Sequence, residues 1–231
     1  MTDEYADHDW PILESNTEYE TGWYDGGYDL VEQPDGTTKQ YYWAALDPAV
    51  VIVATTGDEL VMVEQYRPAI GEHCLELPAG LVEDGESFTT AGARELREEA
   101  GLDPAGISLV EEFWCATGVL RHRRGIVFAE GLEPVEVDRD SNEFLSVTTV
   151  PVEEALERAR EQPSNDATLE GILLAQADGL IRSTVRRLTS NTPHIRMDGE
   201  ISGPDLEATL ESDDRPLIVD IRNARQFERL R

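Results

Sequence analysis

Two short apolar runs mark the centre of the predicted sheet. Residues 49–54 (AVVIVA) and 60–64 (LVMVE) are rich in β-branched residues, and the polar segment TTGDE separates them, so together they predict a hairpin of two strands. Strand-like stretches follow at residues 107–114, 125–129 and 143–150, and helical periodicity appears at residues 88–100, 152–161 and 167–178, with a further candidate helix ending at residue 188. This order predicts a mixed sheet with helices packed on it, in the α/β (α+β) class.

Ahead of these runs, residues 9–42 are rich in aromatic and turn-forming side chains. The segment QPDGT at residues 33–37 predicts a tight turn, and its flanks predict strands. We therefore expect a small N-terminal antiparallel β unit. Its aromatic residues include Trp10, Tyr19, Trp23, Tyr24 and Tyr28.

The length of 231 residues and the hydrophobic content of 40% fit one main core with a small appendage. We divide the chain into an N-terminal β region (residues 1–45), a main domain (residues 46–190) and a C-terminal extension (residues 191–231). No run of about 18 apolar residues occurs, and the N-terminus shows neither a basic start nor an apolar stretch. We expect a cytoplasmic protein that does not bind a membrane.

The charge of the chain is strongly negative. Its 48 acidic and 19 basic residues give a formal charge of −29, and Lys39 is the single lysine. Such an excess of like charge is screened in concentrated salt, so the composition favours a protein from a salt-loaded, halophilic cytoplasm over an ordinary acidic protein. It argues against DNA as a partner, because DNA binding needs a basic surface.

The two cysteines, Cys74 and Cys115, are far apart and have no CxxC or His-rich neighbourhood. A zinc site is therefore not expected. We predict that both are buried, reduced thiols.

The candidate chemistry lies in residues 80–102, where acidic residues recur at helical spacing. Glu95, Glu98 and Glu99 are spaced i, i+3 and i+4, so their carboxylates share one face of a helix. Ser87 is placed to cap that helix ahead of Phe88, and Gly101 to end it in a left-handed conformation. The neighbouring arc carries Ala93, Leu96 and Ala100, which are expected to bury against the sheet.

Three like charges at this spacing repel one another and require compensation. Their hard oxygens suit Mg²⁺, with Mn²⁺ as the alternative, and such an ion also bridges to substrate phosphates. Arg94 is expected to brace the glutamates and lower their pKa values, while Glu86 either pairs with Arg94 or joins the metal shell. Three acidic residues alone would fit a solvated face better, but the surrounding motif favours the metal site.

The full motif resembles the signature of the Nudix hydrolases. It runs from Gly80 through Glu86, Arg94-Glu95-Leu96, Glu98-Glu99 and Ala100 to Gly101-Leu102. The resemblance implies an α/β/α sandwich, metal binding by Glu95 and Glu99 with the carbonyl of Ala79, and assistance from Glu98. It also implies hydrolysis of a nucleoside diphosphate linked to another group.

The flanking segments VEQYRP (residues 63–68) and ELPAG (residues 76–80) resemble the ADP-ribose pyrophosphatase branch of that family, as does the PDG turn leading to Tyr41 and Tyr42. This resemblance covers roughly residues 9–188. It implies cleavage of ADP-ribose into AMP and ribose 5-phosphate. Sugar nucleotides, NADH and dinucleoside polyphosphates are the alternative substrates, and a non-catalytic ADP-ribose-sensing regulator is the alternative function.

The branch also implies a homodimer in which the N-terminal sheet helps to stack the adenine, with Trp23, Tyr24 or Tyr28 as candidates. For any one of these rings, packing in the core of the small sheet is the favoured expectation. Arg67 is a candidate for a substrate phosphate, and a structural salt bridge is an equal alternative. In the loop after the sheet, Glu143 is the candidate general base and Asp140 the second choice, against a merely solvated acidic loop.

Residues 116–124 (ATGVLRHRR) depart from the branch, whose members often carry Ser-Pro-Gly and an acidic residue there. Arg121 and its basic neighbours either meet a phosphate or another terminal group of the substrate, or pair with acidic side chains. Both alternatives stay open, and with them the identity of the substrate.

The C-terminal segment resembles the beginning of a rhodanese-like domain, notably in VDIR at residues 219–222. A rhodanese needs a nucleophilic cysteine, and the sequence has none after Cys115, so this segment is not expected to transfer sulfur. A degenerate remnant, a truncated fusion and a dimer-packing extension remain the three interpretations.

Overall fold

The computed structural model describes residues 9–136 and 144–182. Its larger sheet forms around the two apolar runs, which become β4 (Ala49–Thr56) and β5 (Glu59–Arg67). The strand order is β11-β5-β4-β10-β8, with β6 paired to β5 and β7 to β4. Because β10 runs parallel to β4 while the other pairs are antiparallel, the sheet is mixed. The remaining strands are β6 (Glu72–Glu76), β7 (Ala79–Leu81), β8 (Leu102–Trp114), β10 (Arg123–Pro134) and β11 (Leu145–Pro151).

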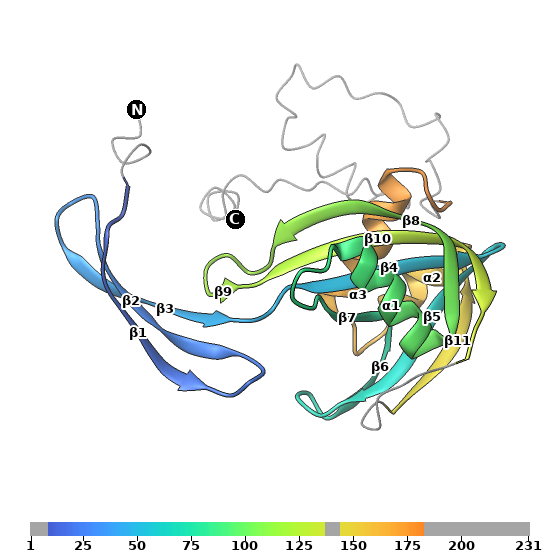
Figure 1. Cartoon of the computed structure of the whole chain (residues 1–231), viewed down its shortest axis with the longest axis horizontal. Helices are drawn as coiled ribbons and strands as arrows, with labels where there is room; N and C mark the ends of the chain where they lie inside the picture. Colours follow the sequence, from blue (N-terminus) through green and yellow to red (C-terminus); the bar gives the residue numbers. More distant parts are fainter. Residues whose placement is uncertain (1–8, 137–143, 183–231) are drawn as a thin grey trace, which may run out of the picture. The chain divides into compact units, whose positions relative to one another are not determined.

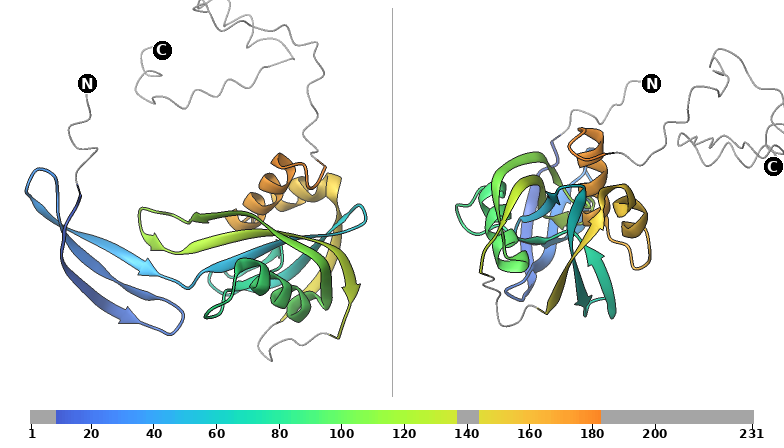
Figure 2. Two further views of the ribbon diagram at one scale, coloured as in Figure 1. Left: turned by 45° about the horizontal axis from the view of Figure 1, so that its top comes forward. Right: turned by 90° about the vertical axis from the view of Figure 1, so that its right-hand side faces the viewer.

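Helices cover both faces of this sheet (Figures 1 and 2). Alternate residues of β4 point to opposite faces: Val51 and Val53 pack in one apolar cluster, and Val50 and Ile52 pack in the other. The first cluster includes residues of α2 (Val152–Ala159) and α3 (Asp166–Ala177), and the second includes Leu96 of α1 (Phe88–Ala100). The predicted sandwich with a mixed sheet is therefore confirmed.

The N-terminal segment forms a second sheet, as predicted. It consists of β1 (Ile12–Glu20), β2 (Asp25–Glu32) and β3 (Thr38–Ala45), which pair in antiparallel fashion, and the short β9 (Leu120–Arg121), which pairs in parallel with β3. The tight turn lies where the sequence places it, because Gly36 has a φ of 80° and its N–H donates to the carbonyl of Gln33 (2.9 Å).

The structure differs from the predicted elements mainly at the short strands. β6, β7 and β9 were not predicted, and β8 and β10 are longer than their apolar stretches, since β8 begins at Leu102 and β10 ends at Pro134. The candidate helix ending at residue 188 and the extension at residues 191–231 lie outside the described residues. None of the helices in the described ranges is long and apolar enough to cross a membrane.

Candidate active site

Local sequence determines how α1 begins and ends. The hydroxyl of Ser87 accepts the N–H of Thr90 (3.1 Å), and Gly101 has a φ of 66° while its N–H donates to the carbonyl of Arg97 (3.0 Å). Leu96 is fully buried against the sheet. Both predicted caps and the predicted anchor are confirmed, and they fix which face of α1 carries the glutamates.

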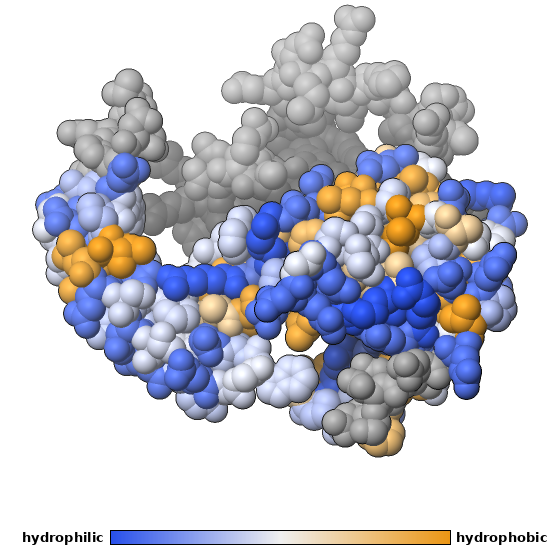
Figure 3. Space-filling view, viewed as in Figure 1, coloured by the Kyte–Doolittle hydropathy of each residue, from blue (hydrophilic) through white to orange (hydrophobic). Residues whose placement is uncertain are grey.

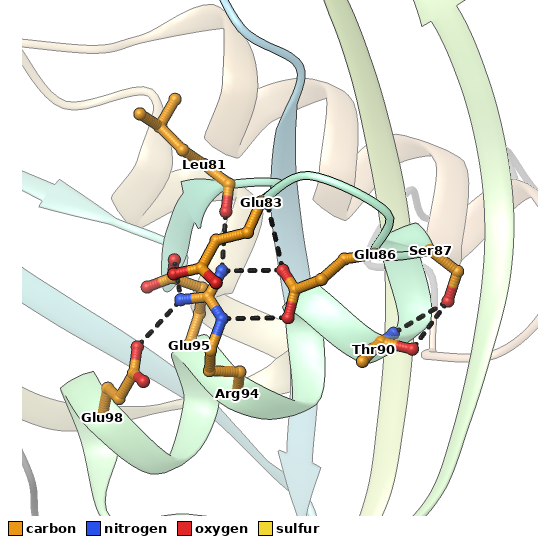
Figure 4. Close-up of polar contacts among 8 residues, drawn as sticks. All are labelled: Leu81, Glu83, Glu86, Ser87, Thr90, Arg94, Glu95 and Glu98. Carbon is orange, nitrogen blue, oxygen red and sulfur yellow. Dashed lines mark hydrogen bonds and ion pairs between the residues drawn. The ribbon is translucent and has the colours of Figure 1, made fainter.

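Two of the three glutamates are buried at the turn that connects β6 to β7. Glu95 is 7% exposed and Glu99 5%, and Oε2 of Glu99 accepts the N–H of Ala79 (3.1 Å). The Glu95 carboxyl group lies against Gly80, since a Cβ at Gly80 would come closer than 3.0 Å to it. Because Gly80 has no side chain, the Glu95 carboxyl group can lie against its backbone. Ala79 therefore lies beside Glu99, and Gly80 lies beside Glu95. Figure 4 shows Glu95 together with Glu98.

Arg94 connects these acidic residues through its guanidinium group (Figure 4). Nη1 donates to Glu95 (2.8 Å) and to Glu98 (2.9 Å), while Nε and Nη2 form a bidentate pair with Glu86 (3.1 and 3.0 Å). Nη2 also donates to the carbonyl of Leu81 (2.8 Å). The predicted brace is confirmed, and of the two alternatives for Glu86 the structure shows the pairing with Arg94.

The hydrogen bonds from Arg94 hold the pKa of Glu86 below its ordinary value. The same carboxylates raise the pKa of Arg94, with Glu86 as the largest contributor. The lowered pKa belongs to Glu86, and the lowering expected for the glutamates of the helical face stays a prediction. The Glu86–Arg94 ion pair therefore keeps its charges at neutral pH.

The donor chemistry of the cluster fits a hard divalent cation, because the carboxylate groups of Glu95 and Glu99 lie beside Gly80 and Ala79, where Gly80 has no side chain. Among the residues that the structure describes, however, no three His, Cys, Asp or Glu side chains stand in a ligand geometry. In this structure Arg94 binds Glu95 and Glu98, and the N–H of Ala79 binds Glu99.

Arg67 lies close to this cluster and makes a salt bridge. Its Nε and Nη2 both donate to the buried carboxylate of Glu76, which also accepts from Gln65 (3.0 Å). The structural alternative for Arg67 is therefore realised, although 45% of its side chain stays exposed. Glu76 itself was not singled out as a functional residue, even though it opens the ELPAG segment.

Each arginine of the basic run has an acidic partner. Arg121 pairs with the buried Asp29 and lies 4.1 Å from the centre of the Trp43 ring, and Arg123 pairs with Glu112. Arg124 is 12% exposed and contacts Asp166 (3.1 Å) and Glu170 (2.6 Å). The structure thus shows the pairing with acidic side chains, and the substrate-binding role of Arg121 stays a prediction.

The aromatic candidates are more exposed than expected. Trp23 is 79% exposed and Tyr24 42%, so the expectation that they pack in the core of the small sheet is wrong; both lie at or near the turn between β1 and β2, away from its interior. Tyr28 is partly buried and contacts Tyr42, with ring centroids 5.8 Å apart. Glu143 and Asp140 lie outside the described residues.

Both cysteines are buried and free, as predicted. Burial is the main cause that raises the pKa of each thiol.

Comparison with known proteins identifies the family. The NUDIX domain matches residues 45–170, which is more than half of the chain. The chain belongs to the Nudix family. Nudix hydrolases generally depend on a divalent metal.

Several curated relatives support this assignment. The chain is 30% identical over 177 residues to an ADP-ribose pyrophosphatase of Mycobacterium tuberculosis, covering 74% of this chain and 86% of the relative. It is 30% identical to an ADP-ribose pyrophosphatase of Bacillus subtilis (59% and 76% covered) and 31% identical to a methanol dehydrogenase activator of Bacillus methanolicus (60% and 77% covered).

The fold is also that of a solved structure. A crystal structure of an ADP compounds hydrolase superposes with a TM-score of 0.70 at 23% identity and covers 76% of this chain and 98% of that one. At this level of identity the likeness shows the fold alone.

Proposed function

We propose that this Nudix hydrolase cleaves ADP-ribose into AMP and ribose 5-phosphate with Mg²⁺ held by Glu95, Glu99 and the carbonyl of Ala79. The observation that carries the proposal is the burial of Glu95 and Glu99 against Ala79 and Gly80. Their carboxylate oxygens are the ligands that a hard divalent cation prefers, and a cation offsets the repulsion between two neighbouring buried carboxylates. The ADP-ribose pyrophosphatases among the relatives support the choice of substrate.

The proposed ion would neutralise the diphosphate, activate a water and stabilise the leaving phosphate. Glu98, whose side chain is 34% exposed, is proposed to assist from the solvent side of the cluster, and Glu143 to accept a proton from the attacking water. Arg94 holds Glu95 and Glu98 in place through Nη1. Mn²⁺ offers the same octahedral oxygen coordination and is the expected substitute.

Arg67 is proposed to bind a substrate phosphate while it keeps its salt bridge to Glu76. Its Nε and Nη2 donate to Glu76, while nearly half of the side chain remains exposed beside the cluster. A guanidinium group has five N–H donors, so Nη1 is left to approach an anion. This arrangement keeps a cation near the glutamates without leaving it unpaired when no substrate is bound.

The N-terminal sheet is proposed to form a homodimer and to stack the adenine with Trp23 or Tyr28. Figure 3 shows an apolar patch over this sheet. The exposed large hydrophobic residues of the N-terminal region include Trp10, Ile12, Leu13, Tyr19, Trp23 and Tyr42. Exposed aromatic residues in such number favour a partner surface. Light scattering in concentrated salt should give twice the chain mass, and a monomer at micromolar concentration would contradict the dimer.

The charge of −29 supports a cytoplasm rich in salt, and it sets the conditions of the assay. AMP release from ADP-ribose should be measured with Mg²⁺ in concentrated salt, next to a panel of sugar nucleotides, NADH and dinucleoside polyphosphates. We expect the highest kcat/KM for ADP-ribose. A higher kcat/KM for another compound would make that compound the substrate in place of ADP-ribose. Binding of ADP-ribose without turnover of any compound would favour the alternative function, a non-catalytic ADP-ribose-sensing regulator.

The metal assignment is tested by Glu99→Gln, which keeps the shape of the side chain and removes its charge. We expect metal-dependent turnover to fall at least about 100-fold with the fold intact. Glu154→Gln is the matched control, because Glu154 is exposed on α2. Unchanged activity of Glu99→Gln would remove Glu99 from the metal site.

A further inference from the structure

Two residues outside any strand separate β6 from β7, immediately before the proposed metal ligand Ala79. Leu77 and Pro78 belong to neither strand. Leu77 is 1% exposed, so its backbone groups are shielded from water and need partners from elsewhere in the fold.

Three backbone groups of residues 77–79 have distant partners. The N–H of Ala79 donates to Oε2 of Glu99 (3.1 Å), and the carbonyl of Pro78 accepts the N–H of Ile52 (2.9 Å). The N–H of Leu77 donates to Oγ1 of Thr168 (3.1 Å), which lies 91 residues further along the chain. Thr168 is 1% exposed, so water does not compete with this bond.

The first turn of α3 holds the Thr168 hydroxyl in a fixed place. Oδ1 of Asn165 accepts the N–H of Thr168 (2.8 Å), and Nδ2 of the same residue reaches Glu76 (3.3 Å). Gly171 lies so close to Leu77 that an added Cβ would come within 2.6 Å of Leu77 Cδ1. The largely buried Arg124 of β10 makes ion pairs with Asp166 and Glu170 of α3.

We propose that Thr168 is a positioning residue for the hydrolysis: by binding the N–H of Leu77, its hydroxyl fixes the Leu77–Ala79 turn so that Ala79 stays beside Glu99. The inference rests on the proposed function, because Ala79 and Glu99 are its metal ligands. Thr168 acts through the backbone of Leu77 and not on the substrate. Residues that orient metal ligands in this way typically affect metal affinity as well as turnover.

Two substitutions separate the effect of the Thr168 hydroxyl from the effect of the side-chain volume. Thr168→Val keeps the branched shape and removes the hydroxyl, and Thr168→Ser keeps the hydroxyl and removes a methyl group. The dissociation constant of Mn²⁺, followed by the paramagnetic resonance signal of the free ion in concentrated salt, reports on the site without turnover. We expect Thr168→Val to weaken Mn²⁺ binding about tenfold and to lower kcat, with KM changed by less than about twofold, and Thr168→Ser to stay within about twofold of the wild type.

A purely structural role predicts a different result. Both variants would then lose thermal stability while Mn²⁺ affinity stayed at the wild-type value, and this outcome would overturn the inference. If Thr168→Val does not fold, exchange of the Leu77 amide hydrogen in the wild type decides: Mn²⁺ should slow it at least about threefold, and equal exchange with and without Mn²⁺ would also overturn the inference.

The same measurements distinguish this inference from the proposed function. A wild type that binds Mn²⁺ but does not hydrolyse ADP-ribose contradicts the proposed substrate, and the affinities of the variants still decide the role of Thr168. A wild type that binds no Mn²⁺ overturns the metal site and the positioning role together.

Discussion

Gly80 and Glu95 are complementary in shape: the carboxyl group of Glu95 occupies the space where a Cβ at Gly80 would lie. The backbone at Gly80 is not in the left-handed region, so the glycine is not needed for its conformation. It is needed because a buried carboxylate lies against it, on the turn that also carries Ala79. The missing side chain at Gly80 therefore serves the carboxylate cluster and not the backbone conformation of the turn.

Gly80→Ala should test this relationship directly. The added methyl group displaces the Glu95 carboxylate, and a shift of about 1 Å at a catalytic group costs on the order of 100-fold in rate. We expect kcat/KM for ADP-ribose to fall by about that factor, with a melting temperature close to that of the wild type.

Gly106→Ala provides the matched control, because a Cβ there would make an ordinary contact of 3.5 Å with Glu130. It should leave both the rate and the melting temperature unchanged. Full activity of Gly80→Ala would show that Glu95 can move without loss and is not a metal ligand.

The parts of the site that could be predicted from sequence are those fixed by neighbours within one helix. Ser87 and Gly101 set the ends of α1 through hydrogen bonds to residues of the same helix, and helical periodicity places Leu96 on its buried face. Arg94 reaches Glu98 across one helical turn, which periodicity also reveals.

The parts that sequence did not reveal depend on pairing between distant segments. β7 has three residues and β9 has two, too few for any periodic pattern, and each forms only because β4 or β3 lies beside it. The partner of Arg121 is 92 residues away and the partner of Leu77 is 91. Composition alone could suggest that acidic partners exist, but not which ones.

The ion pair between Arg94 and Glu86 makes stability depend on pH. Because Arg94 holds the pKa of Glu86 below its ordinary value of 4.5, the ionised carboxylate contributes stability above that pH, and the contribution is lost as the pH falls through the lower, folded-state value. Glu86→Gln should therefore be less stable than the wild type at pH 7, and the difference should shrink below pH 4.5.

Urea unfolding at constant high salt across this pH range measures the effect. Glu154→Gln, at an exposed site of α2, should follow the wild-type pH dependence throughout. A constant difference between Glu86→Gln and the wild type down to the lowest pH would mean that the charge of Glu86 does not matter for stability.

The two thiols should be unreactive in the folded protein. Burial raises the pKa of Cys74 and of Cys115, and only the thiolate attacks a disulfide reagent. At pH 8 we expect no more than slow reaction with an aromatic disulfide reagent in concentrated salt, and release of two equivalents after unfolding in guanidinium chloride. Rapid reaction of one thiol in the folded state would show that the segment around it opens.

A substitution can decide whether Arg121 stabilises the fold or binds the substrate. The buried carboxylate of Asp29 also accepts from Ser15 (2.7 Å) and from the Trp43 indole (3.0 Å), so Arg121→Ala removes its cation but leaves two hydrogen bonds. We expect a loss of about 1 kcal/mol in the free energy of unfolding and no change in KM for ADP-ribose.

Arg123→Ala is the matched control for that experiment, since Arg123 and its partner Glu112 are both partly exposed, with side chains 48% and 28% accessible. Exposed pairs contribute little, so this variant should lose less than about 0.5 kcal/mol. If instead Arg121→Ala raises KM severalfold while its unfolding curve matches the wild type, then Arg121 leaves Asp29 to bind the substrate, and the ion pair in the structure is the resting arrangement of a binding residue.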